Sequence, residues 1–304
     1  MPLTVETCPH TGLRYGKLHA KQANLAAESP RRVLIYIAGL GGSVKWALGF
    51  LLRLLPGFDV VYGLDLQGFG LNDDRSVPLE NGGVRHQQQS VITTVRYLLE
   101  QHPEASFHIS GISLGALLST LVVGAFPQRF SSIALFAPAY QPHAKTFSLA
   151  FQLRCAWGII STLGKRPIQL PYGLAQLTQN PKILKDSQFD LNWRLQVPTG
   201  YLWSIQGLAK QAQTATAKLP LPVWMVIPGL DSICDPHAMR QAFQSLPNHP
   251  HHQCVEEGNL FHDVMMEAQA DTLANQYLQW IDALDTLAET EEAELSPDQA
   301  VHSS

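Results

Sequence analysis

The segment FHISGISLGALLSTL, residues 107–121, constrains the fold more than any other part of the chain. Ser113 stands between Gly111 and Gly115, where a β-branched apolar run gives way to a longer apolar run. A G-x-S-x-G pattern between a buried strand and a buried helix is typical of a nucleophile elbow, whose turn is so sharp that side chains flanking the serine would clash. The segment therefore predicts a reactive serine hydroxyl exposed at a helix N-terminus.

The rest of the chain alternates short apolar runs with longer helical patterns. The apolar runs are rich in β-branched residues and carry apolar residues on both faces, as in RRVLIYIAG, FDVVYGLDL, FSSIALFAPAY and PVWMVIPG. Strands of this kind belong to parallel sheets that helices cover on both sides. We therefore expect an α/β fold with a mostly parallel central sheet and helices on both faces.

The alternation is interrupted once. Residues 143–219 follow a mostly helical pattern divided by prolines, after which strands of the same kind resume. An insertion into a single domain explains this order, so we expect a core formed by residues 1–142 and 220–284 with a helical cap at 143–219. Residues 285–304 are acidic and lack an apolar period, which predicts a disordered tail.

Composition excludes several classes of function. A net charge of −4 without a basic stripe gives no reason to expect nucleic acid. The four cysteines lie far apart and form no C-x-x-C pair, so we expect reduced thiols, no disulfide framework and no metal site. The histidine run at 249–252 is interpreted as polar surface. Residues 1–21 lack the apolar stretch of a secretory signal, which favours the cytoplasm.

The serine hydroxyl needs a base and an acid, which in this kind of site follow later strands in the order Ser, Asp, His. Asp231 lies in the loop beyond the strand PVWMVIPG, and His262 lies in the loop after the last strand. We expect His262 to act as the base and Asp231 to orient it. Asp235 is the alternative acid, but its position before Pro236 favours a role as a helix cap.

An oxyanion needs two backbone N–H donors. The residue after the nucleophile, Leu114, supplies one. The loop after the strand VLIYIAG is rich in glycine, with Gly39 and Gly41 on either side of Leu40. Because glycines let a backbone approach closely, we expect the second donor to be the N–H of Leu40.

These motifs together resemble the monoacylglycerol lipase and lysophospholipase-like branch of the α/β-hydrolases, which includes serine aminopeptidase-type hydrolases. The matching pieces are AGLGGS, LDLQGFGLND, GISLG, LFAPAY, GLDSICD and FHDVMME, and the resemblance covers most of residues 30–283. It implies an α/β-hydrolase fold, a triad of Ser113, Asp231 and His262, and oxyanion donors at Leu40 and Leu114. Three positions depart from the family pattern, namely Ala38, Gln67 and Asn72.

The resemblance implies a serine hydrolase that needs no cofactor and cleaves a carboxylic ester with an apolar acyl chain, such as a monoacylglycerol or lysophospholipid. A thioesterase, a peptidase or a cofactor-free haloperoxidase could use the same triad. The alternative from another class of function is a catalytically inactive relative that binds a ligand or partner. The aromatic and aliphatic segment 146–162 could line an acyl cavity or make transient contact with a membrane surface. The oligomeric state is left open.

Overall fold

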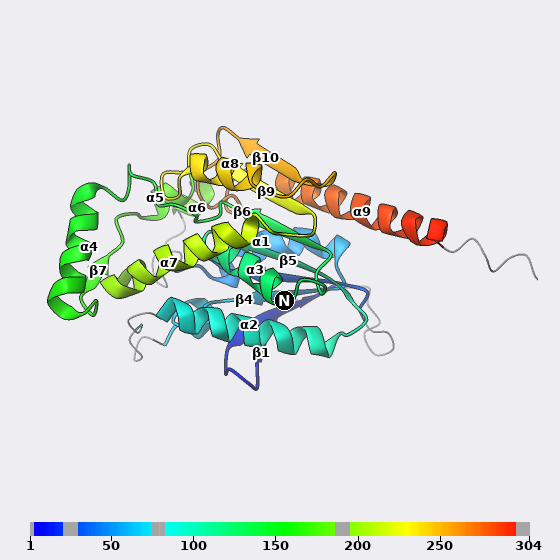
Figure 1. Cartoon of the computed structure of the whole chain (residues 1–304), viewed down its shortest axis with the longest axis horizontal. Coiled ribbons are helices and arrows are strands. Elements are labelled where there is room, and N and C mark those ends of the chain that lie inside the picture. The colour runs from blue at the N-terminus through cyan, green and yellow to red at the C-terminus, as the bar shows by residue number, and fades with distance from the viewer. Residues whose placement is uncertain (1–2, 21–29, 75–78, 80–82, 186–194, 296–304) are drawn as a thin grey trace, which may run out of the picture.

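The computed structural model describes residues 3–20, 30–74, 79, 83–185 and 195–295 (Figure 1). Its centre is an eight-stranded sheet in the order β1-β2-β4-β3-β5-β6-β9-β10. Pairing is parallel from β4 through β10 and antiparallel at β1 and β2, so the expected mostly parallel sheet is confirmed. The strands are β1 (Leu3–Thr7), β2 (Arg14–His19), β3 (Arg32–Ile37), β4 (Val60–Leu64), β5 (Ser106–Ile112), β6 (Ser132–Phe136), β9 (Val223–Pro228) and β10 (Gln253–Glu257).

Helices cover both faces of the sheet and separate two apolar cores. Along β3, Leu34 and Tyr36 pack into one core, whereas Val33, Ile35 and Ile37 pack into the other. This alternation follows from the period of two in a β-strand, and it explains why the run is apolar throughout. One face carries α1 (Val44–Leu54) and α9 (Ala270–Leu295), and the other carries α2 (Gly83–Gln101), α3 (Leu114–Ala125) and α8 (Pro236–Gln244).

Short helices and an edge hairpin complete the core. The 3₁₀ helices η1 (Leu55–Gly57) and η2 (Gly70–Asn72) follow α1 and β4. The hairpin β1–β2 was not expected from the sequence. Its outer strand β1 has only exposed and half-buried residues, because it lies at the edge of the sheet. A strand with no buried residue lacks the apolar run that marks the central strands.

The cap elements lie between β6 and β9, within the segment predicted as an insertion. They are α4 (Leu149–Thr162), β7 (Pro167–Gln169), α5 (Leu174–Leu177), α6 (Pro181–Lys185), β8 (Gln196–Pro198) and α7 (Thr199–Thr216). The antiparallel pair β7–β8 was not expected, since each strand has only three residues. Helix α7 packs on α2, α3 and α4, so it joins the cap to the core. Figure 1 shows α4 and the end of α9 at opposite ends of the molecule.

The last helix corrects one expected boundary. It begins at Ala270 and continues to Leu295, beyond the expected start of a disordered tail at 285. The residues from 285 to 295 include Ala, Leu and Glu, which are good helix formers, and the helix is already anchored by packing before them. Residues 296–304 of the predicted tail lie outside the described residues. No described helix is both long and apolar enough to cross a bilayer.

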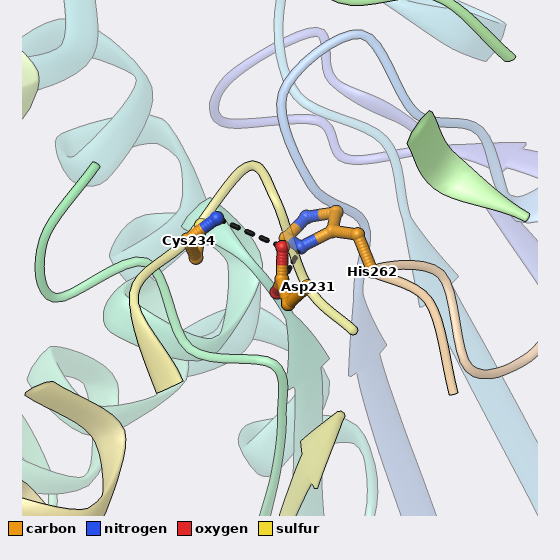
Figure 2. Close-up of side chains that lie close together, drawn as sticks. All are labelled: Asp231, Cys234 and His262. Carbon is orange, nitrogen blue, oxygen red and sulfur yellow. Dashed lines mark hydrogen bonds and ion pairs between the residues drawn. The ribbon is translucent and has the colours of Figure 1, made fainter. Parts of the chain in front are cut away.

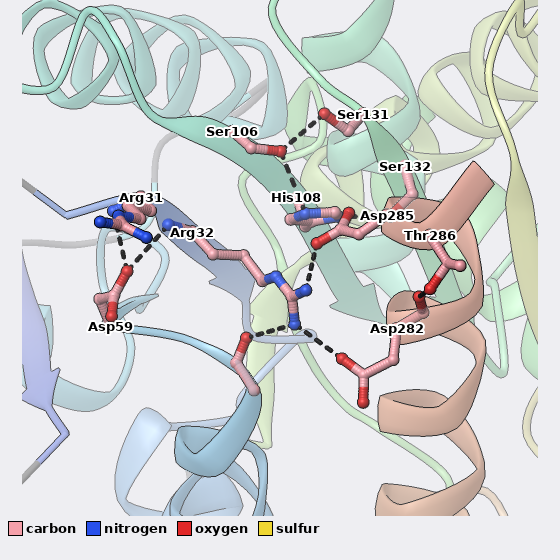
Figure 3. Close-up of polar contacts among 11 residues, drawn as sticks. Arg31, Arg32, Asp59, Ser106, His108, Ser131, Ser132, Asp282, Asp285 and Thr286 are labelled. Carbon is pink, nitrogen blue, oxygen red and sulfur yellow. Dashed lines mark hydrogen bonds and ion pairs between the residues drawn. The ribbon is translucent and has the colours of Figure 1, made fainter. Parts of the chain in front are cut away.

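A cluster of ion pairs fixes α9 to the start of β3 (Figure 3). The Arg32 guanidinium donates to Asp282 at 2.9 Å and to the carbonyl oxygen of Gly57 at 2.9 Å, and it also pairs with Asp285. The Asp59 carboxylate accepts the backbone N–H of Arg32 at 3.0 Å. The first residue of the predicted tail therefore takes part in a contact with the sheet.

Candidate active site

Ser113 occupies the turn between β5 and α3. Its backbone has φ 56° and ψ −118°, a strained conformation that is rare for a residue with a side chain. A Cβ on Gly115 would lie 2.1 Å from the carbonyl oxygen of Ile37, and one on Gly111 would lie 2.4 Å from that of Gly115. Only glycine fits at these two positions, so the sequence enforces the turn that presents the Ser113 hydroxyl.

Asp231 and His262 meet beyond the carboxyl ends of β9 and β10. The Nδ1 atom of His262 lies 2.7 Å from Oδ2 of Asp231, and both side chains are buried (Figure 2). The other carboxylate oxygen, Oδ1, accepts the backbone N–H of Ile233 at 2.8 Å and that of Cys234 at 2.9 Å. Three donors therefore fix the Asp231 carboxylate, which in turn orients the His262 ring.

Asp235 has the other role considered for it. It is the N-cap of α8, and its side chain accepts the backbone N–H of His237 at 2.9 Å. Of the two carboxylates in this loop, Asp231 is the one in contact with His262.

The Cys234 thiol makes contacts that the sequence did not predict. It lies beside the Ser113 hydroxyl and the His262 ring, and both groups act on its pKa. Among the described residues no direct hydrogen bond joins Ser113 to His262, and the Cys234 thiol is a neighbour of both. Burial raises the pKa of Cys234, which keeps it a protonated thiol and a poor nucleophile.

The pKa of His262 reflects two opposed effects. Burial lowers the pKa of the imidazole, but the negative charge of Asp231 and the hydrogen bond to it hold this pKa well above its ordinary value. The Asp231 carboxylate thus stabilises a protonated His262, which is the state that a general base reaches after it has taken a proton.

The glycine-rich loop after β3 lies against the elbow. A Cβ on Gly39 would lie 3.2 Å from the Cβ of Ser113, and Gly41 has a left-handed φ of 73°. Within the described part of the chain, the N–H of Leu40 donates to no backbone or side-chain acceptor. The N–H of Leu114 belongs to the first turn of α3, where helical N–H groups lack intrahelical partners. Both residues border the same cavity as Ser113.

Asp65 connects the end of the glycine-rich loop to η2. Its buried carboxylate accepts the N–H of Val44 at 2.6 Å, the hydroxyl of Ser43 at 3.0 Å and the N–H of Leu71 at 2.6 Å. Burial raises the pKa of Asp65 to about 6, although these hydrogen bonds oppose the shift. The sequence contained Asp65 at the start of LDLQGFG, but only the structure shows that it joins this loop to η2.

Two cavities open onto Ser113. The larger, of about 550 Å³, lies between the cap and the core. Its lining is mainly apolar and includes Leu114, Phe147, Phe151, Ile159, Leu202 and Ile233. The smaller, of about 40 Å³, is bordered by Ser113, His262, Tyr36 and Asp263. The hydroxyl therefore lies at the junction of a large apolar space and a small, more polar one.

A mostly parallel sheet with a serine elbow and an Asp–His pair at the ends of later strands defines an α/β hydrolase. The profile of the family described as serine aminopeptidase S33 matches residues 28–269. The chain therefore belongs to the serine aminopeptidase S33 family of α/β hydrolases. No curated protein matches the sequence.

Solved structures with the same fold include lipases and esterases. A monoacylglycerol lipase from Paleococcus ferrophilus aligns with a TM-score of 0.70 and 17% identity, over 90% of this chain and 99% of its own. A soluble variant of monoglyceride lipase from Saccharomyces cerevisiae, in complex with a substrate analog, aligns with 0.75 and 17%, over 93% and 95%. A carboxyl esterase from Bacillus coagulans, in complex with glycerol, gives 0.73 and 13%, over 93% and 99%. At these identities the likeness concerns the fold.

Proposed function

We propose that the protein is a serine hydrolase that cleaves carboxylic esters through an acyl-enzyme formed on Ser113. The observation that carries this proposal is the buried Asp231–His262 pair, which shares the Cys234 thiol as a contact with the serine of a strained elbow. A structural serine would need neither the strained turn nor a charged pair buried beside it.

In the proposed mechanism, the Ser113 hydroxyl exchanges its contact with Cys234 for one with His262 when substrate binds. We expect a rotation about the serine χ1 bond to make this exchange, because Ser113 and His262 border the same smaller cavity. Neutral His262 takes the hydroxyl proton as the oxygen attacks the ester carbonyl, and it then gives that proton to the leaving alcohol. The N–H groups of Leu40 and Leu114 bind the oxyanion, and water later hydrolyses the acyl-enzyme with His262 as the base.

An apolar acyl chain fits the larger cavity best. About 550 Å³ is a typical volume for a site that encloses a small molecule, and most of the lining side chains are aliphatic or aromatic. The smaller cavity would receive part of the alcohol, because it is bordered by Tyr36 and Asp263. Monoacylglycerols and lysophospholipids have this division into one apolar chain and one polar group, as does the substrate named for two of the structural neighbours.

The outer face of α4 supports substrate capture from a lipid surface. Leu149, Leu153, Trp157 and Ile160 follow one another at helical spacing and are 71%, 62%, 60% and 75% exposed. The inner face of the same helix borders the cavity through Phe151, Cys155 and Ile159. A helix that is apolar on both sides fits a cap that touches lipid with one face and substrate with the other.

The positive charge of the cap also supports contact with a lipid surface. Residues 143–219 contain nine Lys or Arg and two Asp, a net charge of +7, in a chain whose total is −4. Arg154, Lys165 and Arg166 are exposed near the apolar face of α4. Because cationic residues beside an apolar face bind anionic lipids, we propose transient contact of the cap with a negatively charged membrane surface.

A fluorophosphonate probe tests the catalytic proposal. The wild type should be labelled covalently, and Ser113→Ala should not be labelled although it folds normally. Absence of labelling in the wild type would favour an inactive relative that binds a ligand. A panel of p-nitrophenyl esters, monoacylglycerols, thioesters and amides then separates a lipid esterase from a thioesterase or peptidase. A preference for short acyl chains would contradict the lipid assignment.

A further inference from the structure

Cys234 adds a metal-binding group to the Asp231–His262 pair. A ligand atom from each of the three side chains lies within 4.8 Å of the other two, and all three residues are buried. Figure 2 shows the three side chains together. In the part of the chain that the structure describes, no other group of three His, Cys, Asp or Glu side chains meets this criterion. We propose that this cluster is an inhibitory binding site for Zn²⁺.

The existing hydrogen bonds decide which atoms are available to a metal. The Asp231 carboxylate already accepts two backbone N–H groups at Oδ1 and the His262 ring at Oδ2. Because Nδ1 of His262 hydrogen-bonds Asp231, the ring nitrogen left to bind a metal is Nε2. Metal-binding histidines commonly donate their other ring N–H to a carboxylate, as His262 does here. The ligands are therefore Nε2 of His262 and Sγ of Cys234, with Asp231 orienting the ring.

The donor types select the metal. Thiolate and imidazole ligands suit Zn²⁺, whereas Mg²⁺ and Ca²⁺ prefer oxygen. Tetrahedral Zn²⁺ binds sulfur at about 2.3 Å and nitrogen at about 2.0 Å, which places the two ligand atoms about 3.5 Å apart. A ring nitrogen of His262 and Sγ of Cys234 already lie within 4.8 Å of each other. Small side-chain rotations would complete the site.

An ion can reach this position through the substrate cavity. Cys234 and Ser113 both border the space of about 550 Å³ between the cap and the core. On binding, the Zn–S bond forms as the thiol proton leaves to solvent, and no electrons are transferred. Water or the Ser113 hydroxyl can fill the remaining positions around the ion.

Zn²⁺ at Nε2 would occupy the atom that the proposed mechanism uses as its base. The inhibition should be reversible by a chelator and competitive with substrate, because ion and substrate enter the same space. The inhibition rests on the proposed function, whereas the binding of the ion does not. The two can therefore be tested separately.

Inhibition is measured as the Zn²⁺ concentration that halves each variant's own rate with a p-nitrophenyl ester. For Cys234→Ser, which replaces the thiol with a hydroxyl, we expect this concentration to rise at least tenfold, because even the loss of an outer-shell partner of a metal ligand costs ~10–100-fold in affinity. Cys155→Ser is the matched control, because Cys155 borders the same cavity but is not among the metal-binding cluster. Equal Zn²⁺ sensitivity of the wild type and Cys234→Ser would overturn the proposal.

Co²⁺ provides a readout that does not depend on hydrolysis. Added to Ser113→Ala, Co²⁺ should give a thiolate-to-metal charge-transfer absorption, which Zn²⁺ should abolish by displacing it. The same band should be absent from the double variant Ser113→Ala/Cys234→Ser and retained in Ser113→Ala/Cys155→Ser. A band in Ser113→Ala, together with a wild type that hydrolyses none of the esters, would sustain the metal site and reject the proposed function. Esterase activity of the wild type without a band in Ser113→Ala would do the reverse.

Discussion

The imidazole of His262 and the carboxylate of Asp231 form a buried pair in which Nδ1 lies 2.7 Å from Oδ2. The two residues are 31 positions apart in the chain and belong to loops that follow neighbouring parallel strands, β9 and β10. Because the carboxyl ends of parallel strands share one edge of a sheet, the fold brings these loops together beside the serine elbow. The pair links the architecture to the proposed chemistry.

Replacing Asp231 with Asn tests the orienting role of the carboxylate. The amide keeps the size of the side chain but removes its charge, so a His262 tautomer with the proton on the wrong nitrogen becomes favoured. We expect kcat for ester hydrolysis to fall by about 10⁴-fold. Asp235→Asn is the matched control, since Asp235 caps α8 and should leave kcat within a few-fold of the wild type. Similar losses in both variants would contradict the assignment of Asp231.

The pH dependence follows from the state of His262. The base must be neutral, and the Asp231 carboxylate holds its pKa well above the ordinary value of 6.5, in spite of burial, which lowers it. The value of kcat/KM should therefore rise with pH through a midpoint above 6.5. Removing the negative charge in Asp231→Asn should move this midpoint to lower pH. An unchanged midpoint in a metal-free buffer would contradict the electrostatic role of the carboxylate.

Gly115 and Gly124 provide a matched pair within α3. An alanine Cβ at Gly115 would lie 2.1 Å from the carbonyl oxygen of Ile37, whereas one at Gly124 meets no atom within 4 Å. Gly115→Ala should lower the free energy of unfolding by about 3 kcal/mol or more. Gly124→Ala should leave it unchanged or raise it by up to about 1 kcal/mol, because alanine favours the helix. Urea denaturation measures both, and equal effects would contradict the tight elbow.

Flotation with lipid vesicles tests the outer face of the cap. Binding should be stronger to vesicles that contain phosphatidylglycerol than to pure phosphatidylcholine, and it should weaken with salt. Neutralising Lys165 and Arg166 to Gln should cost about 1 kcal/mol for each charge, or about thirtyfold in the partition coefficient. Trp157→Ser should also weaken binding, and Leu52→Ser, on α1, should not. Hydrolysis of soluble esters should be preserved in these variants, and equal binding by all of them would contradict the docking face.

Much of the site could be predicted from the sequence because chain order and strand topology decide it. The elbow needs two glycines at fixed spacing, and Gly111 and Gly115 stand at the two positions where no side chain fits. The loop of Asp231 follows the apolar, buried strand β9, whereas the loop of His262 follows β10, an exposed edge strand that the sequence marks only by its place between two helical patterns. These features are local in the chain, and their convergence follows from a parallel sheet.

Other features depend on turn geometry, which the sequence does not display. Cys234 reaches Ser113 and His262 because the Asp231 carboxylate accepts the N–H groups of Ile233 and Cys234, which bends the chain back onto the site. The sequence signal for this turn was that Asp231 stands three residues before Cys234. Where α9 passes the expected boundary, Asp282 and Asp285 contact Arg32, which lies about 250 positions away in the chain.

The acyl-enzyme itself gives the most direct test of the account. The wild type is mixed with excess p-nitrophenyl decanoate, quenched within milliseconds, digested and analysed by mass spectrometry. The account predicts a transient decanoyl adduct on the peptide that contains Ser113, located on that serine and absent from Ser113→Ala. An adduct on Cys234 instead, or turnover without any adduct at Ser113, would contradict it.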